Sequence, residues 1–360
     1  MTNREREILE LIKENPMISQ KELSKKLNIE RSSIGVHIAN LIKKGFVKGK
    51  GYIVNEEEYV LVVGGSNIDI SARPYGELKL HDSNPGKSSF SLGGVGRNIS
   101  ENLSKLLVNT KLFTVLGDDT YGREIIEAAK ISGFDISESL ILKDQGTSNY
   151  ISILDENGDM KMAISSMDIY DKLEPKDIAA KKSLFDNSRL LVVDTNIKEE
   201  TLKYIVDNYS KDIFIDTVST QKGLKVKDFI GKFHTIKPNK YEAEVLSGIS
   251  INSKDDLRKC GEHFLNKGVK NVFITLASEG VYYKNEKAEG IIKKDNVKVV
   301  NATGAGDAFV AGLVYSYLNN YDIVRSAKFS MASSILALSS NETINSNFSI
   351  SNINKIQEEI

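Results

Sequence analysis

A glycine-rich turn at residues 299–309 combines an anion-binding backbone with a carboxylate. The segment reads Val-Val-Asn-Ala-Thr-Gly-Ala-Gly-Asp-Ala-Phe, a strand pattern, then glycines, then the start of a long apolar helix. The backbone N–H groups of Gly304, Ala305 and Gly306 would converge at the helix N-terminus and bind an anion. Asp307 is expected to stay ionised there and to accept a proton from an attacking hydroxyl. The alternative is a tight turn in which this Asp only caps the helix.

A second glycine-rich turn, Ser-Leu-Gly-Gly-Val-Gly-Arg-Asn at residues 91–98, precedes another helix. Its glycines allow a ligand to approach the backbone, and its asparagine offers both a donor and an acceptor to hydroxyls. Upstream, an Asn and an Asp follow the first apolar strand, at the carboxyl edge where open α/β sheets bind ligands. A carboxylate can accept two vicinal hydroxyls. The residues predicted to hold a sugar are Asn67, Asp69, Gly93, Gly94 and Asn98.

The third cluster, Lys-Pro-Asn-Lys-Tyr-Glu at residues 237–242, has the spacing of a metal organiser. Asn239 and Glu242 are three residues apart, so on a helix they would share one face and could hold a hydrated Mg²⁺ near phosphates. The alternative is a helix start with an ordinary surface Glu.

The elements that must position these clusters alternate in type from residue 60 onward. Apolar, β-rich runs predict strands at 60–64, 111–116, 190–194, 212–216, 271–275 and 280–284. Helical patterns predict helices at 94–107, 120–132, 198–209, 254–267, 306–319 and 322–338. This alternation favours an α/β fold with a doubly wound, mostly parallel sheet. Residues 149–165 have instead the pattern of a hairpin, and with the strands expected at about 71–92 they predict a small β lid outside the main sheet.

The first 55 residues differ in charge from the rest of the chain. They carry 11 Lys and Arg against 6 Asp and Glu, whereas the remainder carries 37 against 43. We therefore predict two domains, 1–55 and 56–360, divided at an acidic stretch. Apolar spacing predicts three helices before residue 45, with Ser19 and Glu22 forming a capping box at the second. Residues 46–54 have the pattern of two short strands around a basic tip.

Three helices and a basic hairpin resemble a winged helix-turn-helix domain. The resemblance implies that Arg31, Ser32, Ser33 and His37 face the major groove of DNA, while Lys48 and Lys50 reach phosphates. The alternative is a helical dimerisation module whose lysines are merely solvated.

The amino-acid composition excludes several classes of protein. With 40% hydrophobic residues and a net charge of -1, the chain is neither a disordered tail nor a chain-wide polyanion binder. A single cysteine excludes a disulfide framework. No apolar run approaches the roughly 18 residues of a membrane helix, and the N-terminus has no signal-peptide pattern, so we expect a cytoplasmic protein without a membrane partner. The four histidines lack metal-ligand spacing.

The three clusters, in their order along the chain, resemble the PfkB/ribokinase family of sugar and nucleoside kinases over residues 60–345. The resemblance implies phosphoryl transfer from ATP to a primary hydroxyl, with Asp307 as base and the Gly304–Gly306 amides around the transferring group. It assigns Mg²⁺ and phosphates to Asn239 and Glu242, and the sugar to the set already named. The residues implied to bind the nucleotide are Asn239, Thr275, Gly280 and Lys222.

Two positions depart from the family pattern. Asn301 stands where the family usually has Asp, close to where many members bind K⁺, so a K⁺ cofactor is in doubt. Ala277 stands where Gly is frequent, which narrows the room over the nucleotide.

Two segments resemble the pseudouridine-kinase branch of the family. They are Ser-Ser-Met-Asp-Ile-Tyr at 165–170 and Asp-Thr-Val-Ser-Thr-Gln-Lys at 216–222. The resemblance places Met167 and Asp168 at the substrate, which would be pseudouridine phosphorylated on its 5′-hydroxyl. For Met167 the alternative is lid packing, and for Lys222 a solvated helix face.

Other readings stay open on the sequence. The substrate could be uridine, cytidine, inosine or ribose, with the same mechanism. From another class, the chain could be a transcriptional regulator whose kinase fold only senses its ligand, although a base and a metal organiser argue against that. A dual protein could couple nucleoside binding to DNA binding, and the 149–165 hairpin would allow a homodimer through the lid.

Overall fold

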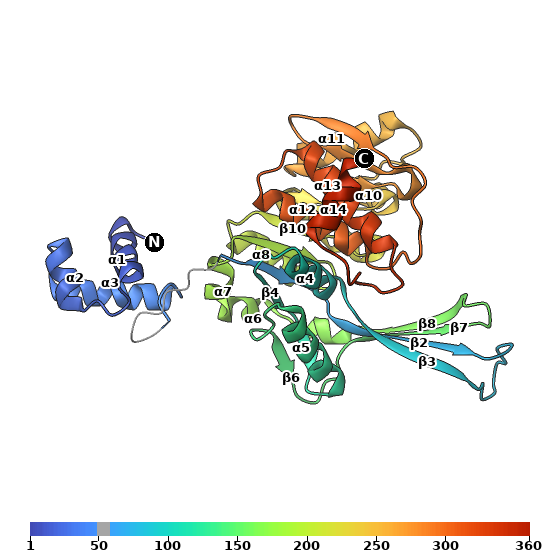
Figure 1. Cartoon of the computed structure of the whole chain (residues 1–360), viewed down its shortest axis with the longest axis horizontal. Helices are drawn as coiled ribbons and strands as arrows, with labels where there is room; N and C mark the ends of the chain where they lie inside the picture. The colour runs from blue at the N-terminus through green and yellow to red at the C-terminus, as the bar shows by residue number, and fades with distance from the viewer. Residues whose placement is uncertain (49–57) are drawn as a thin grey trace.

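The computed structural model of the chain describes residues 1–48 and 58–360. The first part consists of three helices, α1 (Asn3–Glu14), α2 (Gln20–Leu27) and α3 (Arg31–Lys43), packed around a small apolar core (Figure 1). The predicted capping box is confirmed, since Ser19 and Glu22 exchange hydrogen bonds at the start of α2. The three helices predicted before residue 45 are confirmed. Most of the predicted wing, including Lys50, and the predicted domain boundary lie outside the described residues.

The larger part is built on an eight-stranded sheet, which confirms the predicted α/β class. In spatial order its strands are β14 (Glu289–Ile292), β13 (Val281–Lys284), β12 (Asn271–Thr275), β11 (Thr235–Ile236), β10 (Ile213–Asp216), β9 (Leu190–Asp194), β1 (Val60–Val63) and β4 (Thr110–Phe113). Neighbouring strands are parallel from β4 to β12, while β13 and β14 are antiparallel. The carboxyl ends of six parallel strands therefore meet at one edge.

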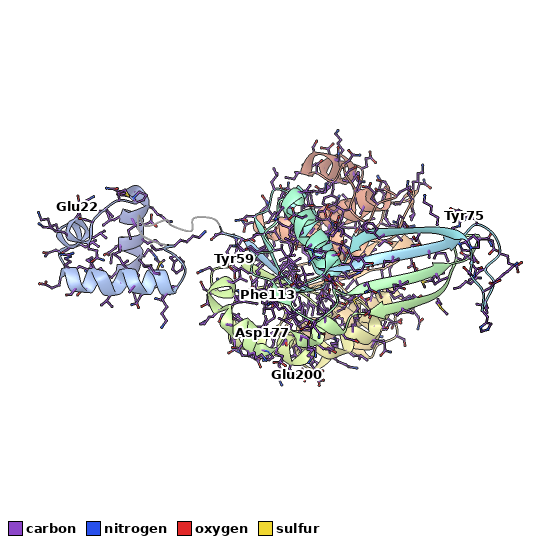
Figure 2. All side chains as sticks on the ribbon, turned by 90° about the horizontal axis from the view of Figure 1, so that it is seen from below. Glu22, Tyr59, Tyr75, Phe113, Asp177 and Glu200 are labelled. Atoms are coloured by element: carbon purple, nitrogen blue, oxygen red, sulfur yellow. The ribbon has the colours of Figure 1, made fainter. Side chains whose placement is uncertain are left out.

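Both faces of this sheet are buried, which explains why its strands are nearly continuous apolar runs. One face packs against α6 (Pro175–Ala180), α7 (Lys182–Asp186), α8 (Glu199–Asn208), α10 (Lys240–Ser247) and α11 (Lys254–Lys267). The opposite face packs against α4 (Val95–Lys105), α5 (Thr120–Ser132), α12 (Ala305–Leu318) and α13 (Ile323–Leu338). The last helix, α14 (Ile350–Glu358), packs on α13. Figure 2 shows the side chains crowding around the sheet near Tyr59 and Phe113.

A second sheet projects from the main body as the lid (Figure 1). Its four strands, in order, are β3 (Gly86–Gly93), β2 (Asn67–Pro74), β7 (Asn149–Leu154) and β8 (Met160–Ser166). Residues 149–165 thus form the expected hairpin outside the main sheet. Tyr75, just beyond the end of β2, lies at the far tip (Figure 2).

Several element predictions need correction. The strand expected at 111–116 is divided after Phe113, because the chain leaves the main sheet and continues as β5 (Val115–Gly117), which pairs with β6 (Leu140–Leu142) in a two-stranded sheet. The two-residue strand β11, the edge strand β14 and the short helices α6, α7, α9 (Thr220–Gly223) and α14 were not predicted. The 3₁₀ segments are η1 (Asp168–Lys172), η2 (Leu224–Lys232) and η3 (Ala277–Glu279). Within the described parts, no helix is both long and apolar enough to cross a membrane.

Candidate active site

The glycine-rich turn before α12 forms an open amide cradle at the carboxyl edge of the sheet. Gly304 precedes the helix with φ of 82°, a left-handed conformation that a side chain would disfavour. No described residue accepts a hydrogen bond from the backbone N–H of Ala305 or Gly306. A Cβ built on Gly306 would lie 3.0 Å from Lys237 Nζ, so an ammonium group borders this cradle. Free amides beside a cation suit a phosphoryl group.

Asp307, in the first turn of α12, is buried and joined to the second glycine-rich turn. Asn98 of α4 donates from Nδ2 to Asp307 Oδ2 at 2.8 Å, although the two residues are 209 positions apart. Arg97 in turn donates to Asn98 Oδ1 at 3.1 Å, which fixes the orientation of that amide. Both ends of the Asn98 side chain are therefore engaged within the protein, where the sequence had suggested hydroxyl partners.

Burial raises the pKa of Asp307 to about 8, and the neighbouring Asp216 carboxylate adds to the rise. This direction is opposite to the one expected from the helix N-terminus. Desolvation of a fully enclosed carboxylate exceeds the stabilisation that the helix end provides. A carboxyl group with a pKa near the working pH is well suited to accept a proton.

The residues predicted to hold a sugar, here called the sugar clamp, come together at the base of the lid. Asn67 donates from Nδ2 to Asp69 Oδ1 at 2.6 Å, and both side chains lie on one face of β2. Gly93 pairs with Asn67 in the lid sheet, directly across from it. Gly94 has φ of 97°, and a Cβ there would lie 2.5 Å from the carbonyl oxygen of Gly65, so the turn packs tightly against the end of β1. Burial raises the pKa of Asp69, while the bond from Asn67 opposes that rise.

Asn239 and Glu242 are in direct contact at the start of α10. Asn239 is the N-cap of α10, and the two residues form a capping box, with Asn239 also donating from Nδ2 to Glu242 Oε1 at 2.8 Å. Glu242 is buried rather than on the surface, and it accepts a bond from Thr217 Oγ1 at 2.7 Å. The pair therefore caps α10, and the alternative of an ordinary surface Glu is wrong because Glu242 is buried.

The predicted nucleotide residues divide into two groups. Thr275 lies beside Asn239, since its N–H donates to the carbonyl of Pro238 at 3.1 Å. Gly280 ends the turn after Thr275, within which Ala277 has φ of 52°, a conformation that explains why glycine suits that position. Lys222 lies elsewhere, donating to Asn196 Oδ1 at 2.6 Å just beyond the end of β9. Burial lowers the pKa of Lys222.

Met167 and Asp168 were predicted to bind the substrate. Within the described residues, no hydrogen bond joins either of them to the other predicted site residues. Met167 packs against the core beneath the sheet, and Asp168 is exposed at the start of η1. Nearby, Tyr170 is fully buried, and its hydroxyl contacts both the N–H and the carbonyl of Ser66. Packing, the alternative for Met167, fits these contacts, and Tyr170 braces the turn that carries Asn67.

Three charged residues at this edge were not assigned a role from sequence. Asp194 ends β9 and accepts a bond from the N–H of Gly65 at 2.7 Å, and burial raises its pKa to about 6. Asp216 ends β10 and forms an ion pair of 2.7 Å with Lys237, both side chains being buried. Burial opposes the charge of Lys237, but Asp216 raises its pKa. Only their positions in the sequence could have indicated a role in the site, because each residue ends or follows a parallel strand at the ligand-binding edge.

The residues at this edge of the sheet fit a Mg²⁺ ion that is coordinated mainly by the phosphates of the nucleotide. No cluster of three or more His, Cys, Asp or Glu in the described ranges could hold a metal by itself. Protein-bound Mg²⁺ commonly keeps several waters and uses one or two carboxylates together with substrate phosphates. Glu242 could supply one such carboxylate, since it accepts three hydrogen bonds within the protein and its Oε1 keeps one lone pair for water.

The DNA-facing residues predicted on α3 are partly accessible. Arg31, Ser32 and Ser33 are exposed at the start of the helix, as is Lys48 beyond it. His37 is half-buried, and its Nδ1 has no hydrogen-bond partner in the described parts of the chain. The start of α3 is therefore exposed to solvent, whereas His37 faces partly into its own domain.

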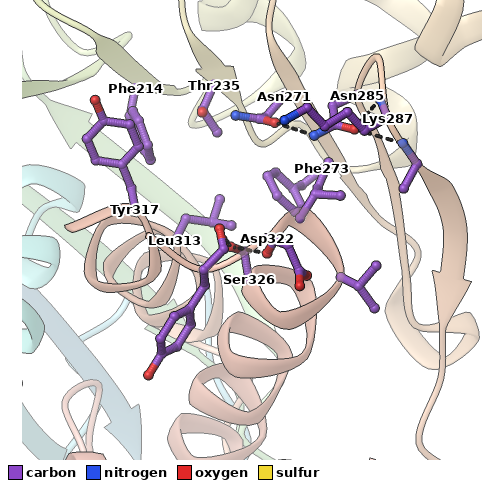
Figure 3. A pocket seen from close by; sticks show the side chains of 14 residues that line it. Phe214, Thr235, Asn271, Phe273, Asn285, Lys287, Leu313, Tyr317, Asp322 and Ser326 are labelled. Atoms are coloured by element: carbon purple, nitrogen blue, oxygen red, sulfur yellow. Dashed lines mark hydrogen bonds between the residues drawn. The ribbon is translucent and has the colours of Figure 1, made fainter. Parts of the chain in front are cut away.

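A cavity of about 400 Å³ lies away from all of these residues (Figure 3). Its lining includes Phe214, Thr235 and Asn271, which lie near the amino ends of β10, β11 and β12. It therefore opens at the opposite edge of the sheet from Asp307.

Comparison with known proteins agrees with this geometry. Residues 57–349 match the model of the pfkB family of carbohydrate kinases, and residues 1–48 match a winged helix-turn-helix DNA-binding model. The sugar kinase YeiI of Escherichia coli is 35% identical over 98% of both chains. The pseudouridine kinase of E. coli is 36% identical over 85% of this chain and 98% of its own.

A solved structure supports the same assignment. A protein from Clostridium perfringens described as a sugar kinase is 37% identical, with a TM-score of 0.78 over 85% of this chain and 97% of its own. The chain thus belongs to the PfkB family of carbohydrate kinases, as a sugar or nucleoside kinase that phosphorylates an alcohol and carries an N-terminal winged helix-turn-helix domain.

Proposed function

We propose that this chain transfers the γ-phosphoryl group of ATP to the 5′-hydroxyl of pseudouridine, with Asp307 as the base. The observation that carries the mechanism is the 2.8 Å hydrogen bond from Asn98 to Asp307, which joins the sugar turn to the carboxylate. The pseudouridine assignment is supported by the 36% identity to a pseudouridine kinase and by the segments at 165–170 and 216–222.

Substrate binding begins at the base of the lid. Asp69 accepts the vicinal hydroxyls of the ribose, while Asn67 holds the carboxylate in place through its own amide. Gly93 leaves room for the Asp69 carboxylate, and Gly94 lets the turn pack against Gly65. With the ring hydroxyls fixed at Asp69, the primary hydroxyl is directed toward Asp307, which Asn98 ties to the same turn.

The chemical step is an in-line displacement. The 5′-oxygen attacks the γ-phosphorus, the bond from that phosphorus to the β,γ-bridging oxygen breaks, and ADP leaves with the bond's electron pair. The proton of the hydroxyl passes to Asp307 and later to solvent. The amides of Ala305 and Gly306, together with Lys237, face the charge that develops on the phosphoryl oxygens.

The nucleotide would bind at Asn239, Thr275 and Gly280, near the ends of two neighbouring strands. Lys222 lies elsewhere, beside Asn196. Glu242 would hold the hydrated Mg²⁺ that accompanies ATP, and the ion would neutralise phosphate charge. We propose no direct K⁺ role for Asn301. Its amide is used within the protein, accepting from the N–H of Thr303 at 2.9 Å and donating to the carbonyl of Asn341 at 3.1 Å.

The test of the substrate is ADP release from ATP and Mg²⁺ with pseudouridine, uridine, cytidine, inosine, adenosine and ribose. We expect turnover with pseudouridine to exceed that with each of the others. A preference for another member would keep the kinase and reject the pseudouridine assignment. Tight binding without any turnover would instead favour the ligand-sensing regulator.

We also propose that the N-terminal domain binds DNA through the exposed start of α3. Support comes from the family match over residues 1–48 and from the net positive charge of residues 1–55. Arg31→Ala should weaken binding to duplex DNA in a fluorescence anisotropy titration, whereas Lys13→Ala, at the end of α1, should change it little. Equal effects of the two variants would argue against the α3 surface. Unchanged affinity at saturating nucleoside would argue against coupling to the kinase.

The lid supports a further proposal, a homodimer. The pairing register places Phe90, Ile70, Ile151 and Ile164 in one row across its four strands. The two outer members of this row are 63% and 60% exposed, so the apolar face has no cover within one chain. A second copy would bury it. Ile164→Glu should reduce the mass measured by light scattering to that of a monomer, while Lys161→Glu in the same strand should not.

A further inference from the structure

The cavity of about 400 Å³ at the amino edge of the main sheet shares its strands with the candidate active site (Figure 3). On each of β10, β11 and β12, a residue that lines the cavity is followed two positions later by a residue of the carboxyl edge. The pairs are Phe214 and Asp216, Thr235 and Lys237, and Phe273 and Thr275. Because side chains alternate along a strand, the two members of a pair lie on the same face of the sheet.

Helix α12 connects the two places on that face. It presents Leu313 and Tyr317, which are four positions apart, to the cavity, and it carries Asp307 in its first turn. Ten positions separate Asp307 from Tyr317, about 15 Å along the helix axis. A molecule that moves or stiffens these elements at the cavity would therefore also act on them at the active site.

The cavity is lined mainly by aromatic and aliphatic side chains. Phe214 and Tyr317 meet edge to face, with ring centroids 5.4 Å apart, and the Tyr317 hydroxyl is bonded to Asp212. Aromatic walls favour a planar ring as the occupant. The two charged lining residues, Lys287 and Asp322, are exposed and opposite in sign, which favours an uncharged ligand.

One polar group of the lining has a fixed orientation and an unused donor. Asn285 Oδ1 accepts hydrogen bonds from the N–H groups of Lys287 and Ala288, both at 2.9 Å, which orients the Asn285 amide. Its Nδ2 donates to Asn271 Oδ1 at 3.2 Å, and this orients the second amide in turn (Figure 3). Within the described residues, Asn271 Nδ2 donates to no acceptor. A carbonyl oxygen of a ligand would satisfy it.

We propose that this cavity is a regulatory site for an uncharged, planar heterocycle with a ring carbonyl. The ring packs between the aromatic side chains, and the carbonyl accepts the hydrogen bond of Asn271. The volume of about 400 Å³ lies within the range of small-molecule sites, about 300–1,000 Å³. The inference does not depend on which nucleoside the kinase phosphorylates.

Coumarin, an uncharged pair of fused rings with one ring carbonyl, is the probe, and its Kd for the full-length chain is measured by calorimetry. Asn271→Leu removes the donor at similar volume and should raise the Kd about tenfold, the effect of one lost hydrogen bond. Ala288→Phe places a ring in the cavity and should abolish binding. Ala179→Phe, at an exposed position of α6 on the other face of the sheet, is the matched control and should leave the Kd unchanged.

Regulation is tested through binding of the nucleotide. Saturating coumarin should change the Kd of a non-hydrolysable ATP analogue with Mg²⁺ at least about fivefold, and the analogue should change the Kd of coumarin by the same factor. In Ala288→Phe, coumarin should leave the Kd of the analogue unchanged.

Absence of coumarin binding to the wild-type chain, or binding that both lining variants retain, would overturn the site. Binding without any effect on the analogue would overturn its regulatory role. A chain that phosphorylates none of the nucleosides would refute the proposed substrate class, while the two Kd values would still decide this inference. A melting temperature for each variant identifies loss of the fold, and if Ala288→Phe is unfolded, Asn271→Leu decides alone.

Discussion

Asp307 is enclosed by residues that come from four separate stretches of the chain. Asn98 donates to it, Lys237 lies near it, and the carboxylates of Asp216 and Asp194 raise its pKa further after burial. A base in this setting holds a proton more tightly than a surface Asp. The same setting makes its ionisation costly for the fold, and both effects can be measured.

The rate should depend on pH through this group. Since the pKa of Asp307 is raised to about 8 in the free protein, kcat/KM should fall about tenfold per pH unit as the pH drops below that value. Initial rates with saturating Mg²⁺ and limiting nucleoside, measured from pH 6 to 9.5, would give the profile. A rate that is flat between pH 6 and 8 would mean that another group takes the proton.

Stability should respond to the same carboxyl in the opposite sense. Its folded-state pKa lies above the unfolded value, so the favourable contribution of the neutral form is complete at low pH and is lost as the pH rises toward about 8. Asp307→Asn cannot ionise. We therefore expect its melting temperature to exceed the wild-type value by more at pH 9 than at pH 6, while turnover falls about 10²–10⁴-fold. Retained turnover would show that the base is misassigned.

Lys237 offers a third test at this scale. Lys237→Met should lower kcat about 100-fold by removing a cation beside the phosphoryl cradle, with little change in KM for the nucleoside. Leaving Asp216 buried without its partner should also cost about 3–5 kcal/mol of stability. The double variant Lys237→Met/Asp216→Asn removes that unpaired charge, so it should recover stability without recovering kcat. Recovery of both would mean that Lys237 acts only on folding.

The residue types predicted many of the residues of this site, but not the hydrogen bonds and ion pairs that join them. Asp307, Asn98 and Asp69 stand in recognisable glycine-rich contexts, and the first two are in direct contact. The Asp216–Lys237 pair was not assigned, because its partners are separated by 21 positions and only the parallel packing of β10 and β11 brings them together. The raised pKa of Asp307 likewise depends on burial, which local sequence does not specify.

At the scale of elements, the N-terminus of α10 is capped by the residues proposed to serve the nucleotide. Asn239 and Glu242 satisfy the free amides at its first turn, and the same carboxylate lies at the nucleotide edge. Glu242→Gln separates these roles, since glutamine can keep a capping box but carries no charge. We expect a stability loss of less than about 1 kcal/mol and a clear rise in the Mg²⁺ concentration needed for half-maximal rate. Asn239→Ala, which removes the cap itself, is the comparison, and an unchanged Mg²⁺ dependence in Glu242→Gln would remove this residue from the metal site.

Elements with long, regular patterns were predictable, and those defined by their neighbours were not. The helices at 120–132 and 254–267 were predicted with their observed bounds, because their apolar spacing and caps are local. Strand β11 has only two residues and exists because β10 and β12 flank it. The division between β4 and β5 arises because the chain changes sheets, which an apolar run does not reveal.

At the scale of the whole molecule, the sheet separates the candidate active site from the N-terminal domain. The N-terminal domain leads into β1 at its amino end, whereas the candidate active site lies at the carboxyl ends of the strands (Figure 1). The two parts meet at the end of α3, where Asn187 donates from Nδ2 to the carbonyl of Lys44 at 2.9 Å. Among the described residues this is the one hydrogen bond between the two parts, beside the packing of Gly45 against Ser183 and Asn187, so we expect the domains to function separately.

Deletion of residues 1–55 tests this separation. The kinase should keep its kcat and KM, and its melting temperature should fall by less than about 4 °C, roughly 1 kcal/mol, because one interdomain hydrogen bond is lost. DNA binding should disappear. The matched variant Asn187→Ala in the full chain should leave both activities in place. A truncated kinase that unfolds or loses turnover would show that the two domains form one unit.

The raised pKa of Asp307 has a consequence for bound ATP when no acceptor is present. At neutral pH a carboxyl with a pKa of about 8 is mostly neutral, so a water molecule that enters beside bound ATP meets an acid and not a base. With Asp307 as the base, ADP release from ATP without an acceptor should therefore be slow at neutral pH and should increase as the pH rises above about 8.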